Sequence, residues 1–120
     1  MKAILLVSHG SRSSKTKEEV IELVKVLKFK TGIDIFEFAF LEIETPSIPE
    51  GLDICVQKGA KQVVILLNFL NSGRHVNNDI PAIVQEAKVK YPDVEFLISQ
   101  PIGQHEKIAD LFSDLISAIG

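Results

Sequence analysis

Apolar residues along the chain follow two alternating patterns. Short continuous apolar runs are typical of strands covered on both faces, and they predict strands over residues 3–7, 34–41, 62–70 and 94–99. After each run, apolar residues recur at the i, i+3, i+4, i+7 spacing of an amphipathic helix. These helices are expected to begin near Lys15, Pro49, Ile80 and Ile108, and Gly32 and Gly59 are natural stops for the first two. No repeat or low-complexity segment interrupts the pattern, which predicts one domain over residues 1–120.

Four strand–helix pairs in alternation predict an α/β fold, a single doubly wound domain whose four-stranded parallel sheet carries helices on both faces. Because crossover connections are right-handed, the expected strand order is 2-1-3-4. Ligands of such sheets bind beyond the carboxyl ends of the strands, at the switch point between the first and third strands. His9 and His75 lie just past those two strands, and Glu42 lies just past the second. The candidate chemistry is therefore expected at one edge of the sheet.

Composition narrows the function classes. A net charge of -3 offers no basic face for nucleic acid, so no nucleic-acid partner is expected. The single cysteine, Cys55, excludes an intrachain disulfide and a thiolate metal cluster, and its place on the apolar face of the second helix predicts a core residue. The apolar residues before Ser8 are too few for a signal peptide or a membrane span, so we expect a cytoplasmic protein without membrane contact.

Two of the three histidines fall at the switch point. Neutral imidazole is the commonest nitrogen ligand of divalent metals, but a closed structural site takes about four ligands. His9 and His75 therefore suit an open site, in which substrate or water completes the ligand set. Each histidine taken alone has a plainer alternative. His9 could bond the backbone beside Gly10, and His75 could be a solvated loop residue.

Three charged residues accompany the histidines. Glu42 could be a solvated residue at a strand end, or it could orient a histidine or accept a proton; the neighbouring Glu44 has no comparable placement. Arg12 and Arg74 are the two arginines of the chain, and each lies within three residues of a site histidine. This placement favours recognition of a carboxylate or phosphate.

Phosphate chemistry finds little support in the motifs. The chain has neither the G-x-x-x-x-G-K-[ST] nor the G-x-G-x-x-G pattern of phosphate-binding loops. A strand followed by His-Gly also resembles phosphohistidine phosphatases, but those carry an arginine immediately before the histidine. Ser8 occupies that position here. A small phosphatase is therefore a minor alternative.

Four short motifs resemble the small sirohydrochlorin chelatases, the short cobalt- or nickel-inserting type of class II tetrapyrrole chelatase. The first motif is the run Leu5-Leu6-Val7-Ser8-His9-Gly10-Ser11-Arg12. The other three are Phe40-Leu41-Glu42 with Pro46 and Ile48, Phe69-Leu70 with Gly73, His75, Asp79, Ile80 and Pro81, and Pro101-Ile102-Gly103. They occur in the family's order and spacing from end to end of the chain. Asn68 stands where family members often have a proline.

The resemblance implies a lyase that inserts a divalent metal, Co²⁺ first and Ni²⁺ second, into sirohydrochlorin on the route to cobalamin or a related modified tetrapyrrole. It makes His9 a proton acceptor and metal ligand, His75 the second metal ligand, and Glu42 an acidic residue near the metal path. It places Thr45 and the run Leu70, Asn71, Ser72, Gly73, Arg74 and His75 along the tetrapyrrole. Arg12 and Arg74 would meet the carboxylates of that substrate. The metal is then a substrate, and no retained cofactor is expected.

Larger relatives build their cleft from two such domains that face each other. A single 120-residue unit offers one face, so the resemblance implies a homodimer that encloses the tetrapyrrole between its subunits. The apolar last helix is a candidate interface. The alternative from another class is a carrier that binds a metal or a tetrapyrrole without turnover.

Overall fold

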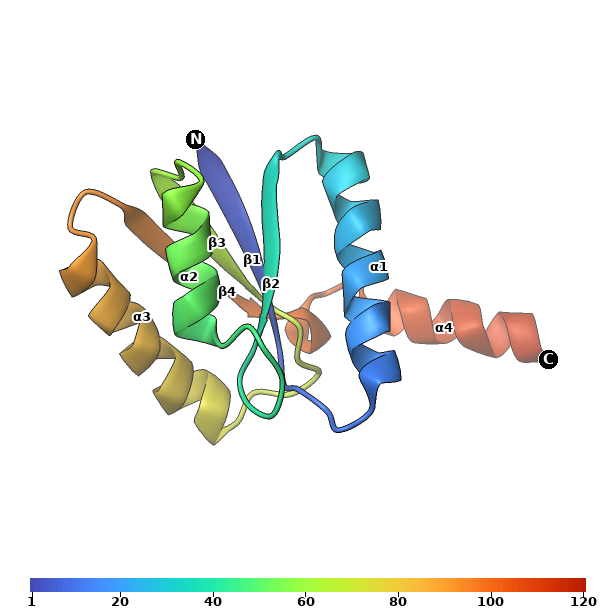
Figure 1. Cartoon of the computed structure of the whole chain (residues 1–120). Coiled ribbons are helices and arrows are strands. Elements are labelled where there is room, and N and C mark those ends of the chain that lie inside the picture. Colours follow the sequence, from blue (N-terminus) through green and yellow to red (C-terminus); the bar gives the residue numbers. More distant parts are fainter.

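Four parallel strands form the sheet in a computed structural model of the protein (Figure 1). They are β1 (Lys2–Ser8), β2 (Ile35–Phe40), β3 (Gln62–Leu67) and β4 (Glu95–Pro101), in the order β2-β1-β3-β4. The structure describes residues 1–120 except for the side chain of His75. The predicted strand order 2-1-3-4 is confirmed, and every neighbouring pair is parallel.

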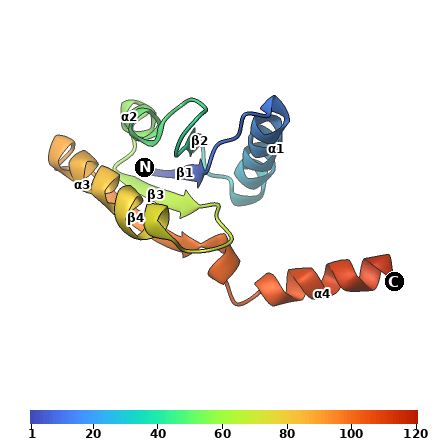
Figure 2. The same ribbon diagram turned by 90° about the horizontal axis from the view of Figure 1, so that it is seen from below.

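The principal helices are α1 (Ser14–Thr31), α2 (Ile48–Gln57), α3 (Ile80–Lys90) and α4 (Ile108–Ile119). A π-helical turn, η1 (His75–Asp79), precedes α3, and a 3₁₀ turn, η2 (Ile102–Gln104), follows β4. Helices α2 and α3 lie on one face of the sheet and α1 lies on the other (Figure 2). The doubly wound arrangement is therefore confirmed.

Burial explains the strand patterns. Residues 3–8 of β1 are all buried because this strand has a neighbour on each side and a helix on each face. In β3, alternate residues separate the two cores: Val63 and Ile65 join the core under α2 and α3, whereas Val64 and Leu66 pack against the core under α1. The sheet is thus apolar on both faces, as its continuous apolar runs predicted.

Helix ends follow recognisable local signals. Ser47 caps α2 in a capping box, in which its hydroxyl accepts a hydrogen bond from Glu50 N and the Glu50 carboxylate accepts one from Ser47 N. The apolar pattern predicts a start at Pro49, whereas the helix begins at Ile48; the S-x-x-E spacing at 47–50 is the signal for this start. Gly32 ends α1 in a left-handed conformation (φ 69°), and its N–H donates to Lys28 O.

The third strand is shorter than its apolar run suggested. β3 ends at Leu67, and Leu70 is exposed. The apolar run therefore continues beyond the sheet into the loop at its carboxyl edge. The η1 turn was not predicted, and β4 continues to Pro101, two residues past the expected end.

Helix α4 extends away from the rest of the domain (Figures 1 and 2). It has no buried residue, and Ala109 to Ile119 are exposed throughout. The radius of gyration is 14.9 Å, whereas about 13.6 Å is expected for a compact domain of this length. No helix among the described residues combines the length and the apolar character that crossing a membrane requires.

Candidate functional site

The loops after β1 and β2 lie side by side beyond the carboxyl edge of the sheet. Leu41 N donates to Ser8 O at 2.9 Å and Glu42 N donates to His9 O at 3.1 Å, so parallel pairing continues past the strand ends. Gly10 adopts φ 106°, and a Cβ atom at this position would overlap the carbonyl oxygen of Glu42. Only glycine permits this approach of the two backbones. The close approach brings the side chains of His9 and Glu42 together.

His9 and Glu42 form a hydrogen bond, with His9 Nε2 and Glu42 Oε1 2.7 Å apart. Because a carboxylate only accepts hydrogen bonds, Nε2 carries the proton in this contact. Both side chains are about half exposed, at 52% and 49%, so the pair faces solvent and a ligand can reach it. The His9 ring also meets Phe69 edge to face, with ring centroids 6.4 Å apart. These contacts orient the imidazole from two sides.

Glu44 anchors the loop that carries His9. Its Oε1 accepts a hydrogen bond from Ser11 N at 2.8 Å. Between the two glutamates, Ile43 adopts the left-handed conformation (φ 72°), which is unusual for a β-branched residue. Glu44 was not expected to have a placement comparable to that of Glu42, and its hydrogen bond to Ser11 N was not predicted. No local pattern signals the contact, because it joins residues 33 positions apart in the sequence.

The loops after β3 and β4 are also joined. Gly103 N donates to Phe69 O at 3.0 Å, and Gln104 Nε2 donates to Ser72 Oγ at 2.9 Å. A Cβ atom on Gly103 would overlap the backbone of Leu70. The loop between β3 and η1 therefore rests on the turn that follows β4.

The remaining residues named by the sequence lie in loops at the same edge. Arg12, Thr45, Asn71, Ser72, Gly73 and Arg74 are all exposed. The carbonyl of Thr45 accepts a hydrogen bond from Lys17 Nζ at 2.8 Å, which ties the loop after β2 to α1. The side chain of His75 lies outside the described residues, so its pairing with His9 stays a prediction.

The described side chains do not make a closed metal site. No group of three or more histidine, cysteine, aspartate or glutamate residues among them is placed to hold a metal ion. The arrangement that is described, an imidazole with a carboxylate at an open edge, can accept a proton or offer one or two ligands to a passing metal. The open site with His9 and His75 that the sequence predicted stays a prediction.

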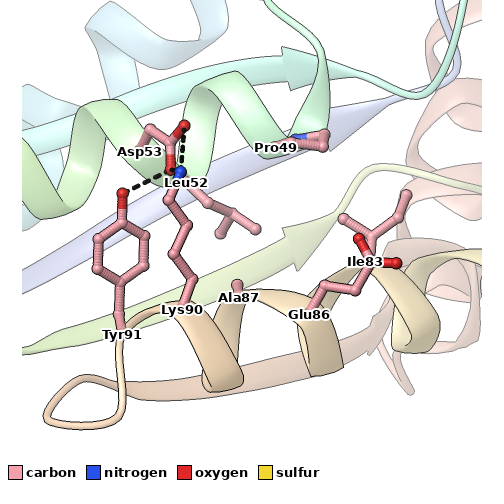
Figure 3. A pocket seen from close by; sticks show the side chains of 8 residues that line it. All are labelled: Pro49, Leu52, Asp53, Ile83, Glu86, Ala87, Lys90 and Tyr91. Atoms are coloured by element: carbon pink, nitrogen blue, oxygen red, sulfur yellow. Dashed lines mark hydrogen bonds and ion pairs between the residues drawn. The ribbon is translucent and has the colours of Figure 1, made fainter.

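A depression lies away from this edge, between α2 and α3 (Figure 3). Its volume is about 190 Å³, and no residue of the predicted site lines it. Asp53 on α2 accepts hydrogen bonds from Tyr91 Oη at 2.7 Å and Lys90 Nζ at 3.2 Å. The Tyr91 hydrogen bond, helped by Lys90, holds the pKa of Asp53 below its ordinary value. These polar groups form hydrogen bonds with one another, and the bonds link α2 to the carboxyl end of α3.

In a comparison with known protein families, residues 3–119 match the CbiX family. The chain is 40% identical over 113 residues to a chloroplastic sirohydrochlorin ferrochelatase of Arabidopsis thaliana. This match covers 94% of this chain and 50% of that relative. It is 32% identical over 117 residues to a sirohydrochlorin cobaltochelatase of Saccharolobus islandicus, covering 92% and 90% of the two chains.

Among solved structures, the sirohydrochlorin chelatase SirB of Bacillus subtilis subspecies spizizenii in complex with cobalt superposes with a TM-score of 0.88. The two sequences are 30% identical, and the match covers 98% of this chain and 50% of that one. The chain spans half or less of the length of the larger curated relatives that it matches.

Proposed function

The chain belongs to the CbiX family, and from this premise we propose that it is a chelatase that inserts a divalent metal ion into sirohydrochlorin. The observation that carries the proposal is the contact between His9 Nε2 and Glu42 Oε1, 2.7 Å apart at the open carboxyl edge of the sheet. Relatives named as cobaltochelatases and as ferrochelatases both support the reaction class. We propose Co²⁺ as the preferred metal and Ni²⁺ as the second choice.

Metal insertion requires a base and a weak metal ligand. Two pyrrole N–H protons leave the macrocycle as the metal enters, and a positioned imidazole suits this transfer because its pKa is ordinarily near neutrality. In this proposal His9 first holds the metal through its unprotonated ring nitrogen. As the metal passes to the macrocycle, that nitrogen accepts one of the two pyrrole protons and the other passes to solvent water. Glu42 keeps the ring oriented and carries negative charge beside the incoming cation. His75 is proposed as the second metal ligand. A ligand set this small releases its metal readily, which suits a metal that is a substrate.

The tetrapyrrole is proposed to lie across the loops at the carboxyl edge. Thr45 and residues 70–75 would line it, and Arg12 and Arg74 would pair with its peripheral carboxylates. Exposed arginines at this edge support the assignment because guanidinium binds carboxylates in a bidentate geometry, and the protein as a whole is acidic. One copy covers one side of a flat macrocycle, so we propose that a homodimer encloses it. A cytoplasmic location remains a prediction of the sequence.

The test is a metal-by-metal insertion assay. The protein is incubated with sirohydrochlorin and Co²⁺, Ni²⁺ or Fe²⁺, and the tetrapyrrole absorption spectrum is followed through several turnovers. We expect catalysed insertion with Co²⁺, and a large loss of rate in His9→Ala and His75→Ala. His105→Ala, which removes the third histidine, is the matched control and should leave the rate unchanged.

The same assay separates the alternatives. A carrier would bind metal or tetrapyrrole stoichiometrically and show no turnover. A phosphatase would release phosphate from generic phosphoesters and would leave the spectrum of sirohydrochlorin unaltered. Unchanged insertion rates in both His9→Ala and His75→Ala would remove the proposed roles of these residues.

A further inference from the structure

Ser8 ends β1 directly before His9, and in the part of the chain that the structure describes it is the one buried polar residue, 7% exposed. Its hydroxyl accepts a hydrogen bond from Asn68 Nδ2 at 3.1 Å. A buried hydroxyl without a partner costs free energy. This bond therefore holds the Asn68 side chain against the end of β1.

The backbone of Asn68 continues the pairing of β1 with β3. β3 ends at Leu67, and the next N–H, that of Asn68, donates to Val7 O at 2.9 Å. The two strands end side by side at the carboxyl edge of the sheet (Figure 2). On the other side of β1, Glu42 N donates to His9 O. The chain at His9 is therefore held from both neighbouring strands.

Asn68 and Phe69 lie on opposite faces of the sheet, because successive residues of a strand alternate between its faces. Leu66 packs on the α1 face, and Asn68, two residues further on, continues that side. Phe69 packs against the core under α2 and α3, and its ring meets the His9 ring edge to face, with centroids 6.4 Å apart. Consecutive residues after β3 thus contact consecutive residues at the end of β1, one pair on each face.

We propose that Asn68 is a positioning residue for His9. Its side chain fixes Ser8 and its N–H fixes the end of β1, and together they set the place of Phe69 against the imidazole. The imidazole is then held in line with Glu42. The inference rests on the proposed role of His9 in metal insertion, and it adds a residue that acts through its neighbours.

Alignment of a base acts on the rate of the chemical step more than on substrate binding. Misplacement of a reacting group by about 1 Å can cost about 100-fold in rate. Asn68 is one step removed from His9, and Glu42 still holds the ring in its absence. We therefore expect loss of the Asn68 contact to lower kcat about 10-fold and to change KM less than about twofold.

The first test compares rate with stability in Ser8→Ala. This change removes the hydroxyl that Asn68 binds and leaves an apolar side chain in a buried place, while the partly buried Asn68 can bond to water. Thermal unfolding should therefore stay near that of the wild type. A purely structural contact would lower the rate only as far as it lowers stability. Positioning predicts the loss in kcat without a matching loss in stability.

The second test is a double-mutant cycle with Asn68→Ala. Because Ser8 and Asn68 act through one hydrogen bond, the double variant should lose about as much kcat as either single variant, about 10-fold and not about 100-fold. Gln62→Ala is the matched control. It removes a side-chain bond between neighbouring strands at the other end of β3, from Gln62 Nε2 to Glu95 Oε1 at 2.7 Å, and should leave kcat unchanged.

A third measurement does not depend on the reaction. Nuclear Overhauser contacts between the ring protons of His9 and Phe69 report the edge-to-face contact directly. They should be present in the wild type and should weaken severalfold in Asn68→Ala. The contacts between Phe38 and Phe40, whose rings also meet edge to face, should stay the same in both proteins.

Four results would overturn the proposal. Ser8→Ala and Asn68→Ala could keep the kcat of a wild type that inserts metal, or their losses could multiply in the double variant. An equal loss in Gln62→Ala would mean that the effect is not specific to His9. Unchanged ring contacts in Asn68→Ala would overturn it without any assay. If the wild type inserts no metal, the proposed function fails, and the ring contacts alone decide whether Asn68 positions His9.

Discussion

His9 Nε2 and Glu42 Oε1 lie 2.7 Å apart although 33 residues separate them in the sequence. The register of the two strands brings them together, since Ser8 pairs with Phe40 and pairing continues into the loops. A carboxylate at this distance aligns the imidazole ring.

Glu42→Gln should lower kcat/KM for metal insertion by about 10–100-fold, because glutamine can still accept the hydrogen bond but removes the charge beside the ring. His9→Ala should cost about 10²–10⁴-fold, the usual contribution of a positioned base. Initial rates measured over a range of sirohydrochlorin concentrations check both values. Glu22→Gln on the exposed surface of α1 is the control, and an equal loss in that variant would contradict a specific role for Glu42.

Gly10→Ala should destabilise the protein more than Gly59→Ala does. The two glycines have nearly the same backbone conformation, φ 106° and 103°, but only at Gly10 would a Cβ atom overlap a neighbour, the Glu42 carbonyl. The shared backbone strain costs about 1–2 kcal/mol. The overlap should add about 1–3 kcal/mol. Denaturant unfolding of both variants measures the difference, and equal losses would mean that the loops do not approach this closely.

Glu44→Ala should reduce the insertion rate while leaving the fold intact, because the loop that carries His9 loses its hydrogen bond to Ser11 N. Glu44→Gln should recover most of the rate, since the amide oxygen can still accept this bond. Rates and circular dichroism spectra of both variants provide the check. If glutamine and alanine behaved alike, charge at this position and not loop anchoring would explain the loss.

Cys55 should not react with thiol reagents in the native protein. Burial raises its pKa to about 12, so the thiolate is scarce and the sulfur is inaccessible at neutral pH. A chromogenic disulfide reagent should detect no thiol in the folded protein and one thiol per chain after unfolding in guanidinium chloride. Ser117→Cys, at an exposed position, should react immediately.

The contact between Asp53, Tyr91 and Lys90 should make stability depend on acidic pH. The pKa of Asp53 is lowered in the folded state, chiefly by the Tyr91 hydrogen bond, so its contribution is complete above the ordinary value of 3.8 and disappears as pH falls through the folded-state pKa. Asp53→Asn should cost about 1 kcal/mol at neutral pH. Its thermal unfolding curve should approach that of the wild type in strong acid. Asp93→Asn, in an exposed turn, is the control.

Local patterns along the chain determined the elements and their order. The continuous apolar runs predicted buried strands, and the 3.6-residue periodicity predicted the helices α1 to α4. Both patterns depend only on how apolar residues are spaced within one element. The alternation of strands and helices, with right-handed crossovers, was enough to predict the order β2-β1-β3-β4. That order by itself places His9 and Glu42 at one edge of the sheet.

Only the tertiary structure decided what those residues touch. The bond from Ser11 N to Glu44 and the close approach of Gly103 to Leu70 join segments about 30 residues apart, and no local propensity encodes them. The exposure of α4 was also decided only by the tertiary structure, because an amphipathic stripe does not specify which surface covers it. Periodicity is a property of one segment, whereas a contact depends on the position of two.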